Sequence, residues 1–183
     1  MRRDSGELQP GEGRSLARLT PAAVIVTGPP AAGKTTLATA LARALHYAIM
    51  DLDTVTGPLT RAALRLSTGD ETAIDSPAGS TLRAARYETL LDVAAANLDV
   101  GVGVVIATPF TAERSSPEDF AWVRRRLRGD DHVAIVYIDT PEQIVRGRLA
   151  SRNAPRDRGE KSVADQVAQV LEALERNSRG ASC

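Results

Sequence analysis

Short apolar runs alternate with amphipathic segments along most of this chain. Runs of strand length lie at about 22–27, 47–50, 102–107 and 133–138. The run at 102–107 is continuously apolar, as is typical of a strand that is covered on both faces. Between these runs, apolar residues recur at helical spacing. Strands that alternate with helices predict right-handed crossovers and therefore a parallel sheet.

Turn and capping residues set the ends of the predicted helices. Ser116, followed by Pro117 and two acidic residues, is typical of a helix start. Gly57 with Pro58 is predicted to open another helix, and Gly101 suits the end of a long one. The predicted helices cover about 34–45, 57–66, 80–99, 116–128, 141–150 and 162–177.

Length and composition restrict the chain to one ordinary domain. Its 183 residues are 43% hydrophobic, which is enough to bury a real core. Residues 1–20 are polar and lack periodicity, so we expect a flexible tail there. Residues 21–183 are predicted to form one α/β domain, with helices in two layers around a parallel sheet of about four to five strands. This is a three-layer α/β/α architecture.

Charge and cysteine content exclude several classes of protein. The formal net charge is zero, so no overall basic field indicates a nucleic-acid partner. The single cysteine, Cys183, permits no disulfide within one chain, which suits a reducing cytoplasm. The first residues lack the apolar core of a signal peptide, and no apolar run reaches membrane-spanning length. We therefore expect a cytoplasmic protein without membrane contact, as a monomer or homodimer.

The residues after the first apolar run have the spacing G-x-x-x-x-G-K-[ST] of a phosphate-binding loop. Glycines let the backbone close around a phosphate, and the following helix adds its positive N-terminal dipole. Lys34 can reach the β- and γ-phosphates, while the Thr35 hydroxyl can ligand Mg²⁺. A glycine-rich turn can also be purely structural, but here every position of the motif matches. The predicted triphosphate site comprises Gly28, Pro29, Pro30, Ala31, Ala32, Gly33, Lys34, Thr35 and Thr36.

A pair of acidic residues follows the second apolar run. Ligands of open parallel sheets bind beyond the carboxyl ends of the strands, where Asp51 and Asp53 lie. In an extended segment both carboxylates point the same way. One can then hold Mg²⁺ while the other accepts a proton from an attacking hydroxyl. Alternatively, Asp51 or Asp53 only caps the next helix. Asp139, after the fourth run, is a second candidate for Mg²⁺.

The phosphate loop and the Asp51-x-Asp53 pair together resemble the small-molecule P-loop kinases of the nucleoside-monophosphate-kinase-like group. This group includes shikimate kinase, gluconate kinase and chloramphenicol phosphotransferase, and the resemblance covers roughly residues 22–160. It implies a P-loop NTPase fold with ATP and Mg²⁺ as cofactors. It also implies a phosphotransferase that moves the γ-phosphate to a hydroxyl of a small molecule, a metabolite or an antibiotic. By this similarity Asp51 lies on the metal side and Asp53 is the candidate catalytic base.

The resemblance extends to a helix that holds the acceptor. The segment 83–88 is similar to the arginine-containing helix of these kinases, so Arg83 or Arg86 would pair with an acidic or polar group of the acceptor. A solvated or ion-paired arginine is the alternative for each.

The segment at about 150–161 resembles the mobile lid of the same group. Arginines on such a lid neutralise the γ-phosphate and exclude water. Arg152 fits best as a catalytic lid arginine, and Arg148 and Arg156 are the next candidates for ATP binding. An exposed, charged helix end is the alternative.

Three features depart from the pattern of the group and leave other functions open. The third run ends without an acidic residue of the Walker B kind, no fifth strand is predicted after the lid, and the acceptor region matches no single member. The first two features favour a nucleotide-dependent switch or adaptor with slow hydrolysis. A nucleotide or polynucleotide kinase is a further alternative. In that case the arginine-rich run 124–128 would bind the phosphates of the nucleic-acid backbone. Such a run is more often a solvated helix face, and the neutral charge argues against it.

Overall fold

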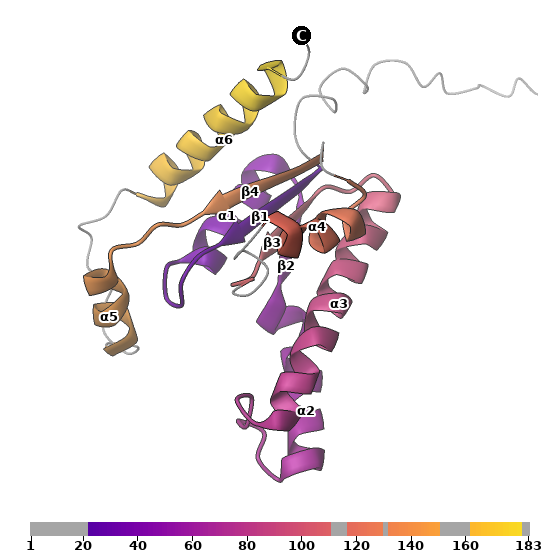
Figure 1. Cartoon of the computed structure of the whole chain (residues 1–183). Coiled ribbons are helices and arrows are strands. Elements are labelled where there is room, and N and C mark those ends of the chain that lie inside the picture. The colour runs from indigo at the N-terminus through magenta and orange to yellow at the C-terminus, as the bar shows by residue number, and fades with distance from the viewer. Residues whose placement is uncertain (1–21, 111–116, 130–131, 151–161, 181–183) are drawn as a thin grey trace, which may run out of the picture.

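A four-stranded parallel sheet lies at the centre of the structure (Figure 1). The computed structural model describes residues 22–110, 117–129, 132–150 and 162–180. The strand order is β2-β3-β1-β4, and every pairing is parallel. Within these ranges no fifth strand follows β4, so the sheet has the smaller of the two predicted sizes. The strands are β1 (Ala23–Thr27), β2 (Ala48–Asp51), β3 (Val104–Ala107) and β4 (Val133–Tyr137).

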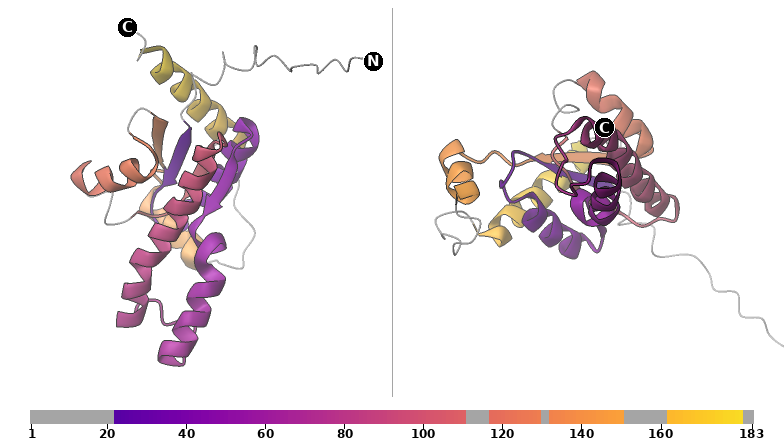
Figure 2. Two further views of the ribbon diagram at one scale, coloured as in Figure 1. Left: turned by 90° about the vertical axis from the view of Figure 1, so that its right-hand side faces the viewer. Right: turned by 90° about the horizontal axis from the view of Figure 1, so that it is seen from below.

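Helices cover both faces of the sheet, which confirms the predicted three-layer α/β/α fold. One hydrophobic cluster joins alternate residues of β1 and β3 to α3 and α4, and the other joins the remaining residues to α1 and α6. Figure 2 shows α1 and α6 on one side of the sheet and α4 on the other. The helices are α1 (Lys34–Leu45), α2 (Leu52–Thr68), α3 (Pro77–Asp99), α4 (Pro117–Arg126), α5 (Glu142–Ala150) and α6 (Val163–Gly180).

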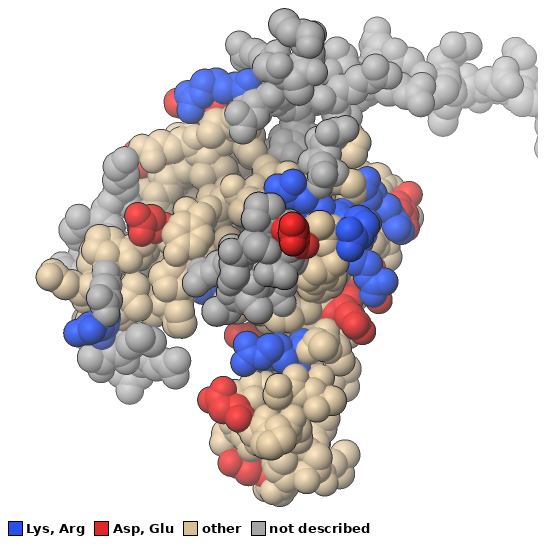
Figure 3. Space-filling view, viewed as in Figure 1, with Lys and Arg blue, Asp and Glu red and all other residues tan. Residues whose placement is uncertain are grey.

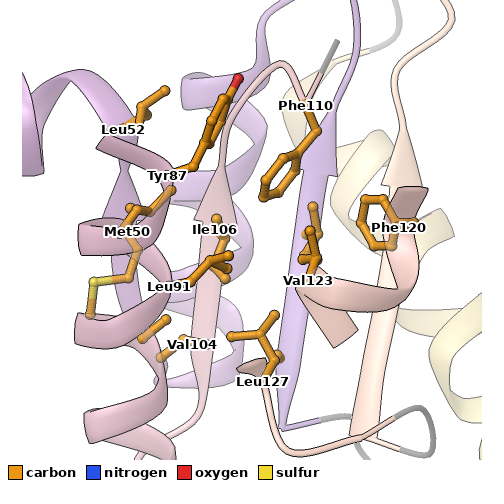
Figure 4. Packing of buried hydrophobic residues seen from close by; sticks show 14 residues of the cluster. Met50, Leu52, Tyr87, Leu91, Val104, Ile106, Phe110, Phe120, Val123 and Leu127 are labelled. Carbon is orange, nitrogen blue, oxygen red and sulfur yellow. The ribbon is translucent and has the colours of Figure 1, made fainter. Parts of the chain in front are cut away.

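The core between the sheet and α3 is organised around Phe110, which follows β3. This side chain is fully buried, and its ring stacks on that of Tyr87 at 5.1 Å between centroids. On its other side it meets the edge of Phe120 at 5.6 Å (Figure 4). Because Tyr87 lies on α3 and Phe120 on α4, the three rings connect both helices of this layer to the end of a central strand.

The prediction that Gly57 and Pro58 open a helix is wrong. The helix α2 begins at Leu52, directly after β2, and Pro58 lies inside it. The reason is local, because the carboxylate of Asp51 accepts a hydrogen bond from the backbone N–H of Thr54 and so caps the helix. Similarly, α3 begins earlier than predicted because the Ser76 hydroxyl accepts from Gly79 N at 3.1 Å.

The helices α2 and α3 lie side by side and together project beyond the sheet (Figures 1 and 2). Since α2 starts at the carboxyl end of β2, this helix pair lies next to the edge where the phosphate loop begins. The predicted tail, 1–20, and the lid segment 151–161 lie outside the described residues. In the ranges that the structure describes, no helix is long and apolar enough to cross a membrane.

The ring cluster predicts a large stability difference between two apolar substitutions. Phe110→Ala should lower the free energy of unfolding by about 3–5 kcal/mol, because it removes a buried ring and leaves a cavity. Leu59→Ala is the control, since Leu59 is 76% exposed on α2 and should change stability by less than about 0.5 kcal/mol. Urea unfolding of both variants measures the difference, and equal losses would contradict this account of the core.

Candidate functional site

The phosphate loop connects β1 to α1 in a conformation that depends on glycine. Gly28 has a φ of 151°, and a Cβ added there would lie 2.8 Å from the carbonyl oxygen of Ile138. Ala31 and Gly33 also have positive φ angles, of 59° and 95°. These angles turn the loop back into the N-terminus of α1, where backbone N–H groups and the helix dipole favour an anion. All nine residues predicted to bind a triphosphate lie in this loop and the first turn of α1.

The side chain of Lys34 bends back over the loop from which it starts. Its ammonium donates to the carbonyl oxygens of Gly28 at 3.1 Å and Pro29 at 2.8 Å. The charged group is therefore held beside the loop by backbone oxygens. It lies where the side chain can exchange these oxygens for those of a phosphate.

Asp51 connects the phosphate loop to α2. One carboxylate oxygen, Oδ2, accepts from the Thr35 hydroxyl at 3.0 Å, while Oδ1 accepts from both the N–H and the hydroxyl of Thr54, also at 3.0 Å. The prediction that Asp51 and Asp53 share an extended segment is wrong, because Asp51 is the helix cap and Asp53 lies in the first turn of α2. Asp51 is thus a cap whose second oxygen faces the phosphate-loop helix.

Thr35 and Asp51 have the chemistry of a magnesium site. Mg²⁺ prefers hard oxygen ligands, and it is usually held by one or two carboxylates together with phosphate oxygens and water. A hydroxyl and a carboxylate oxygen 3.0 Å apart beside the phosphate loop fit this pattern. The described residues contain no group of three or more acidic, His or Cys side chains that could hold a metal by itself.

Asp53 and Arg86 meet across the α2–α3 contact. The Asp53 side chain is 88% exposed, and its Oδ1 accepts from Arg86 Nη2 at 2.5 Å. Arg86 is only 15% exposed and also donates from Nε to the hydroxyl of Thr56 at 3.0 Å. Of the two interpretations of Arg86, acceptor binding or an ion pair, the structure has the ion pair. Arg83, about one turn earlier on α3, is exposed.

Within the described residues, no contact joins the remaining predicted residues to this cluster. Asp139 follows β4 and is exposed, and no hydrogen bond connects it to the phosphate loop within the described ranges. The side chain of Arg148 in α5 lies outside the described part of the chain, as do Arg152 and Arg156.

The run 124–128 is not a continuous phosphate track. Arg126 pairs with Asp92 at 2.9 Å, and Arg128 pairs with Asp99, so two of its arginines bind carboxylates of α3. The Arg128 guanidinium, by hydrogen bonding, holds the pKa of the Asp99 carboxyl below its usual value. Figure 3 shows basic and acidic side chains next to one another on this part of the surface.

The contacts of two threonines at the carboxyl edge of the sheet do not follow from the sequence. The Thr27 hydroxyl, at the end of β1, donates to the carbonyl oxygen of Pro109 at 2.7 Å. Thr108, at the end of β3, is 1% exposed, and its hydroxyl has no hydrogen-bond partner among the described residues. Thr108 stands between β1 and β2, where a Walker B acid was looked for. The strand-end rule points to Thr108, but the sequence gives no sign of which hydroxyl is buried without a partner.

The strand order, the phosphate loop after β1 and the Thr35–Asp51 contact define a P-loop α/β protein. The chain belongs to the AAA domain family (AAA_33), whose family model matches residues 24–177. A comparison with curated protein sequences gives no match.

Several solved structures have the same fold. An unliganded sugar kinase from Janibacter sp. HTCC2649 is 18% identical with a TM-score of 0.58, over 84% of this chain and 94% of that chain. A gluconokinase from Sinorhizobium meliloti 1021 is 18% identical with a TM-score of 0.57, over 88% and 96%. The Mycobacterium tuberculosis APS kinase, in complex with AMPPNP and APS, is 22% identical with a TM-score of 0.52, over 85% and 98%. The resemblance to small-molecule P-loop kinases is therefore confirmed for the fold.

The environment of the Thr108 hydroxyl predicts that a substitution in the core will stabilise the protein. Thr108→Val should raise the free energy of unfolding by about 1 kcal/mol, because a methyl replaces a buried hydroxyl that has no partner among the described residues. Thr108→Ser keeps the hydroxyl and loses a methyl, so it should be less stable than the natural protein. Thermal and urea unfolding measure both. A Thr108→Val variant that is less stable by about 1 kcal/mol or more would mean that the hydroxyl is bonded.

Proposed function

We propose that this chain is an ATP-dependent kinase that transfers the γ-phosphate to a hydroxyl group of a small molecule. The observation that carries the proposal is the carboxylate of Asp51, which bonds to Thr35 of the phosphate-loop helix and also caps the helix that presents Asp53. One short segment thus connects a nucleotide loop to an exposed carboxylate. The kinases named above, with the same fold, support this class of activity.

ATP would bind with its phosphates in the loop Gly28–Thr35 and at the first turn of α1, which includes Thr36. Lys34 would then exchange the carbonyl oxygens of Gly28 and Pro29 for phosphate oxygens. We assign charge neutralisation on the γ-phosphate also to arginines of the segment around the end of α5: Arg148, Arg152 and Arg156. Arg152 is the catalytic candidate among them.

Thr35 and Asp51 would hold Mg²⁺, which when bound neutralises charge on the phosphates. The two oxygens are 3.0 Å apart, whereas Asp139 has no hydrogen bond to the loop in the described ranges. This difference favours Asp51 over Asp139.

Asp53 would accept the proton of the acceptor hydroxyl. The acceptor oxygen attacks the γ-phosphorus, the bond from phosphorus to the β-phosphate oxygen breaks, and ADP leaves. The proton passes to the Asp53 carboxylate and then to water. High exposure of Asp53 suits this role, because the carboxylate is accessible to a molecule in solution. Arg83, exposed on the adjacent helix, is the candidate for contact with the acceptor.

Two other activities have different signatures. A switch or adaptor ATPase, favoured by the four-stranded sheet and the absence of an acid after β3, would hydrolyse ATP slowly and ignore acceptors. A polynucleotide kinase is disfavoured by the ion pairs of Arg126 and Arg128. The test is ADP formation from Mg-ATP with a panel of sugars, sugar acids, polyols, nucleosides and antibiotics. A kinase should show an acceptor that increases turnover by orders of magnitude, and a switch should show none.

Removing the proposed base should separate transfer from binding. Asp53→Asn should lower kcat with the best acceptor by about 100-fold or more, because general-base catalysis is lost. The affinity for a fluorescent ATP analogue should stay within about twofold, since the phosphate loop is unchanged. Steady-state kinetics and fluorescence titration measure the two quantities. A variant that keeps its full kcat would exclude Asp53 as the base.

The magnesium assignment predicts different effects for two acidic residues. Asp51→Asn keeps a good helix cap but loses the negative charge, so it should raise the Mg²⁺ concentration for half-maximal activity by about 10-fold or more. Asp139→Asn is the matched control and should leave this concentration within about twofold. Mg²⁺ titration of ATP turnover measures both variants. The opposite ranking would transfer the metal role to Asp139.

A further inference from the structure

The side chain of Arg86 crosses from α3 to α2 and makes two bonds there. Nε donates to the Thr56 hydroxyl at 3.0 Å, and Nη2 donates to Asp53 Oδ1 at 2.5 Å. We propose that Arg86 is a positioning residue that orients Asp53 for proton transfer, and that it does not bind the acceptor. This inference rests on the proposed kinase function and goes beyond it by giving a role to a residue that no part of that reaction requires.

Thr56 provides a fixed anchor for the guanidinium. Its side chain is buried, with 4% exposure, and its hydroxyl donates to the Leu52 carbonyl oxygen at 2.6 Å. Because the single proton of the hydroxyl is used in this way, its oxygen presents a lone pair to Arg86 Nε. A guanidinium is planar and rigid, so fixing Nε also fixes the direction of Nη2. The orientation of Arg86 is therefore set by a buried group between α2 and α3 and does not require a ligand.

Asp53 receives its orientation from this anchored group. Asp53 and Thr56 are three residues apart on α2 and so lie on the same helix face, the one that meets α3. An exposed carboxylate normally samples several rotamers, and the charge-assisted bond to Arg86 selects among them. Only Oδ1 is used, and Oδ2 of Asp53 has no hydrogen bond to any described residue. One oxygen is thus held while the other stays available for a hydroxyl proton.

The distribution of exposure argues against direct acceptor binding by Arg86. Asp53 is 88% exposed and Arg86 is 15% exposed, so a molecule that approaches from solvent meets the carboxylate first. The charge of the guanidinium is also balanced by Asp53 itself. Arg83, in contrast, is exposed about one turn away on the same helix. The two arginines therefore have different roles, although they occur in the same segment of sequence.

The experiment measures kcat and acceptor KM separately, with saturating Mg-ATP and the best acceptor of the panel. Arg86→Gln should lower kcat by about 10- to 100-fold and change the acceptor KM by less than about threefold, because a misoriented base impairs the reaction and not binding. Thr56→Val removes the anchor and should lower kcat in the same direction. Arg65→Gln is the matched control, since it removes an exposed arginine that pairs with Glu71 at the far end of α2, and it should change neither constant.

A double mutant tests whether the effect of Arg86 on kcat depends on Asp53. If Arg86 acts through Asp53, then Arg86→Gln in the Asp53→Asn background should cause no further loss of kcat. Two results would overturn the proposal. An acceptor KM that rises in Arg86→Gln while kcat is kept would make Arg86 an acceptor-binding residue, and losses of kcat that multiply in the double mutant would show that Arg86 does not act through Asp53. Failure of the kinase function itself has a different result, namely that the natural protein transfers phosphate to no member of the panel.

Discussion

The carboxylate of Asp51 is the contact on which the arrangement of the site depends. It ends β2, caps α2 through Thr54 and accepts a hydrogen bond from Thr35 at the start of α1. A charged cap of this kind contributes about 1 kcal/mol or more to helix stability. The cap also sets the residue at which α2 begins. It thereby determines where Asp53 lies relative to the phosphate loop.

The site consequently has two sides with different supports. The proposed nucleotide side consists mainly of backbone groups. The loop depends on Gly28, which lies so close to Ile138 that residue 28 has no room for a side chain. The proposed acceptor side is built from side chains on two helices, which project beyond the sheet. There, the pair formed by Asp53 and Arg86 joins α2 to α3. In the proposed reaction, the loop would hold the triphosphate and the helix pair would meet the acceptor.

Several charged side chains in the described part of the chain form local pairs. The chain is neutral overall, yet it contains 23 basic and 23 acidic residues. Arg126 and Arg128 bind carboxylates of α3, and Arg86 binds one of α2. The exposed pairs of Arg126 and Arg128 contribute little to stability, but they neutralise charge that would otherwise attract a polyanion. This arrangement agrees with a small-molecule acceptor better than with a long nucleic acid.

The sequence by itself determined the class of fold and the nucleotide side of the site. The phosphate loop is a contiguous motif, and the strands and most helices follow from local periodicity, so no distant contact is needed to predict them. The prediction of a helix start was wrong where two local signals competed. Gly57 and Pro58 suggested a helix start, but Asp51 had already capped the helix six residues before Gly57.

Only the tertiary structure decided which side chains meet at the start of α2 and on α3. Asp51 reaches Thr35 although β3 separates β2 from β1 in the sheet, and Arg86 reaches Asp53 from another helix. In the sequence, Arg83 and Arg86 of α3 had equal weight as candidates. The sequence favoured Asp51 for Mg²⁺ only through the resemblance to kinases and left Asp139 as a second candidate. Such choices depend on how helices pack and which face each one turns toward its neighbour. Since one turn of helix separates Arg83 from Arg86, packing alone makes one exposed and engages the other with Asp53.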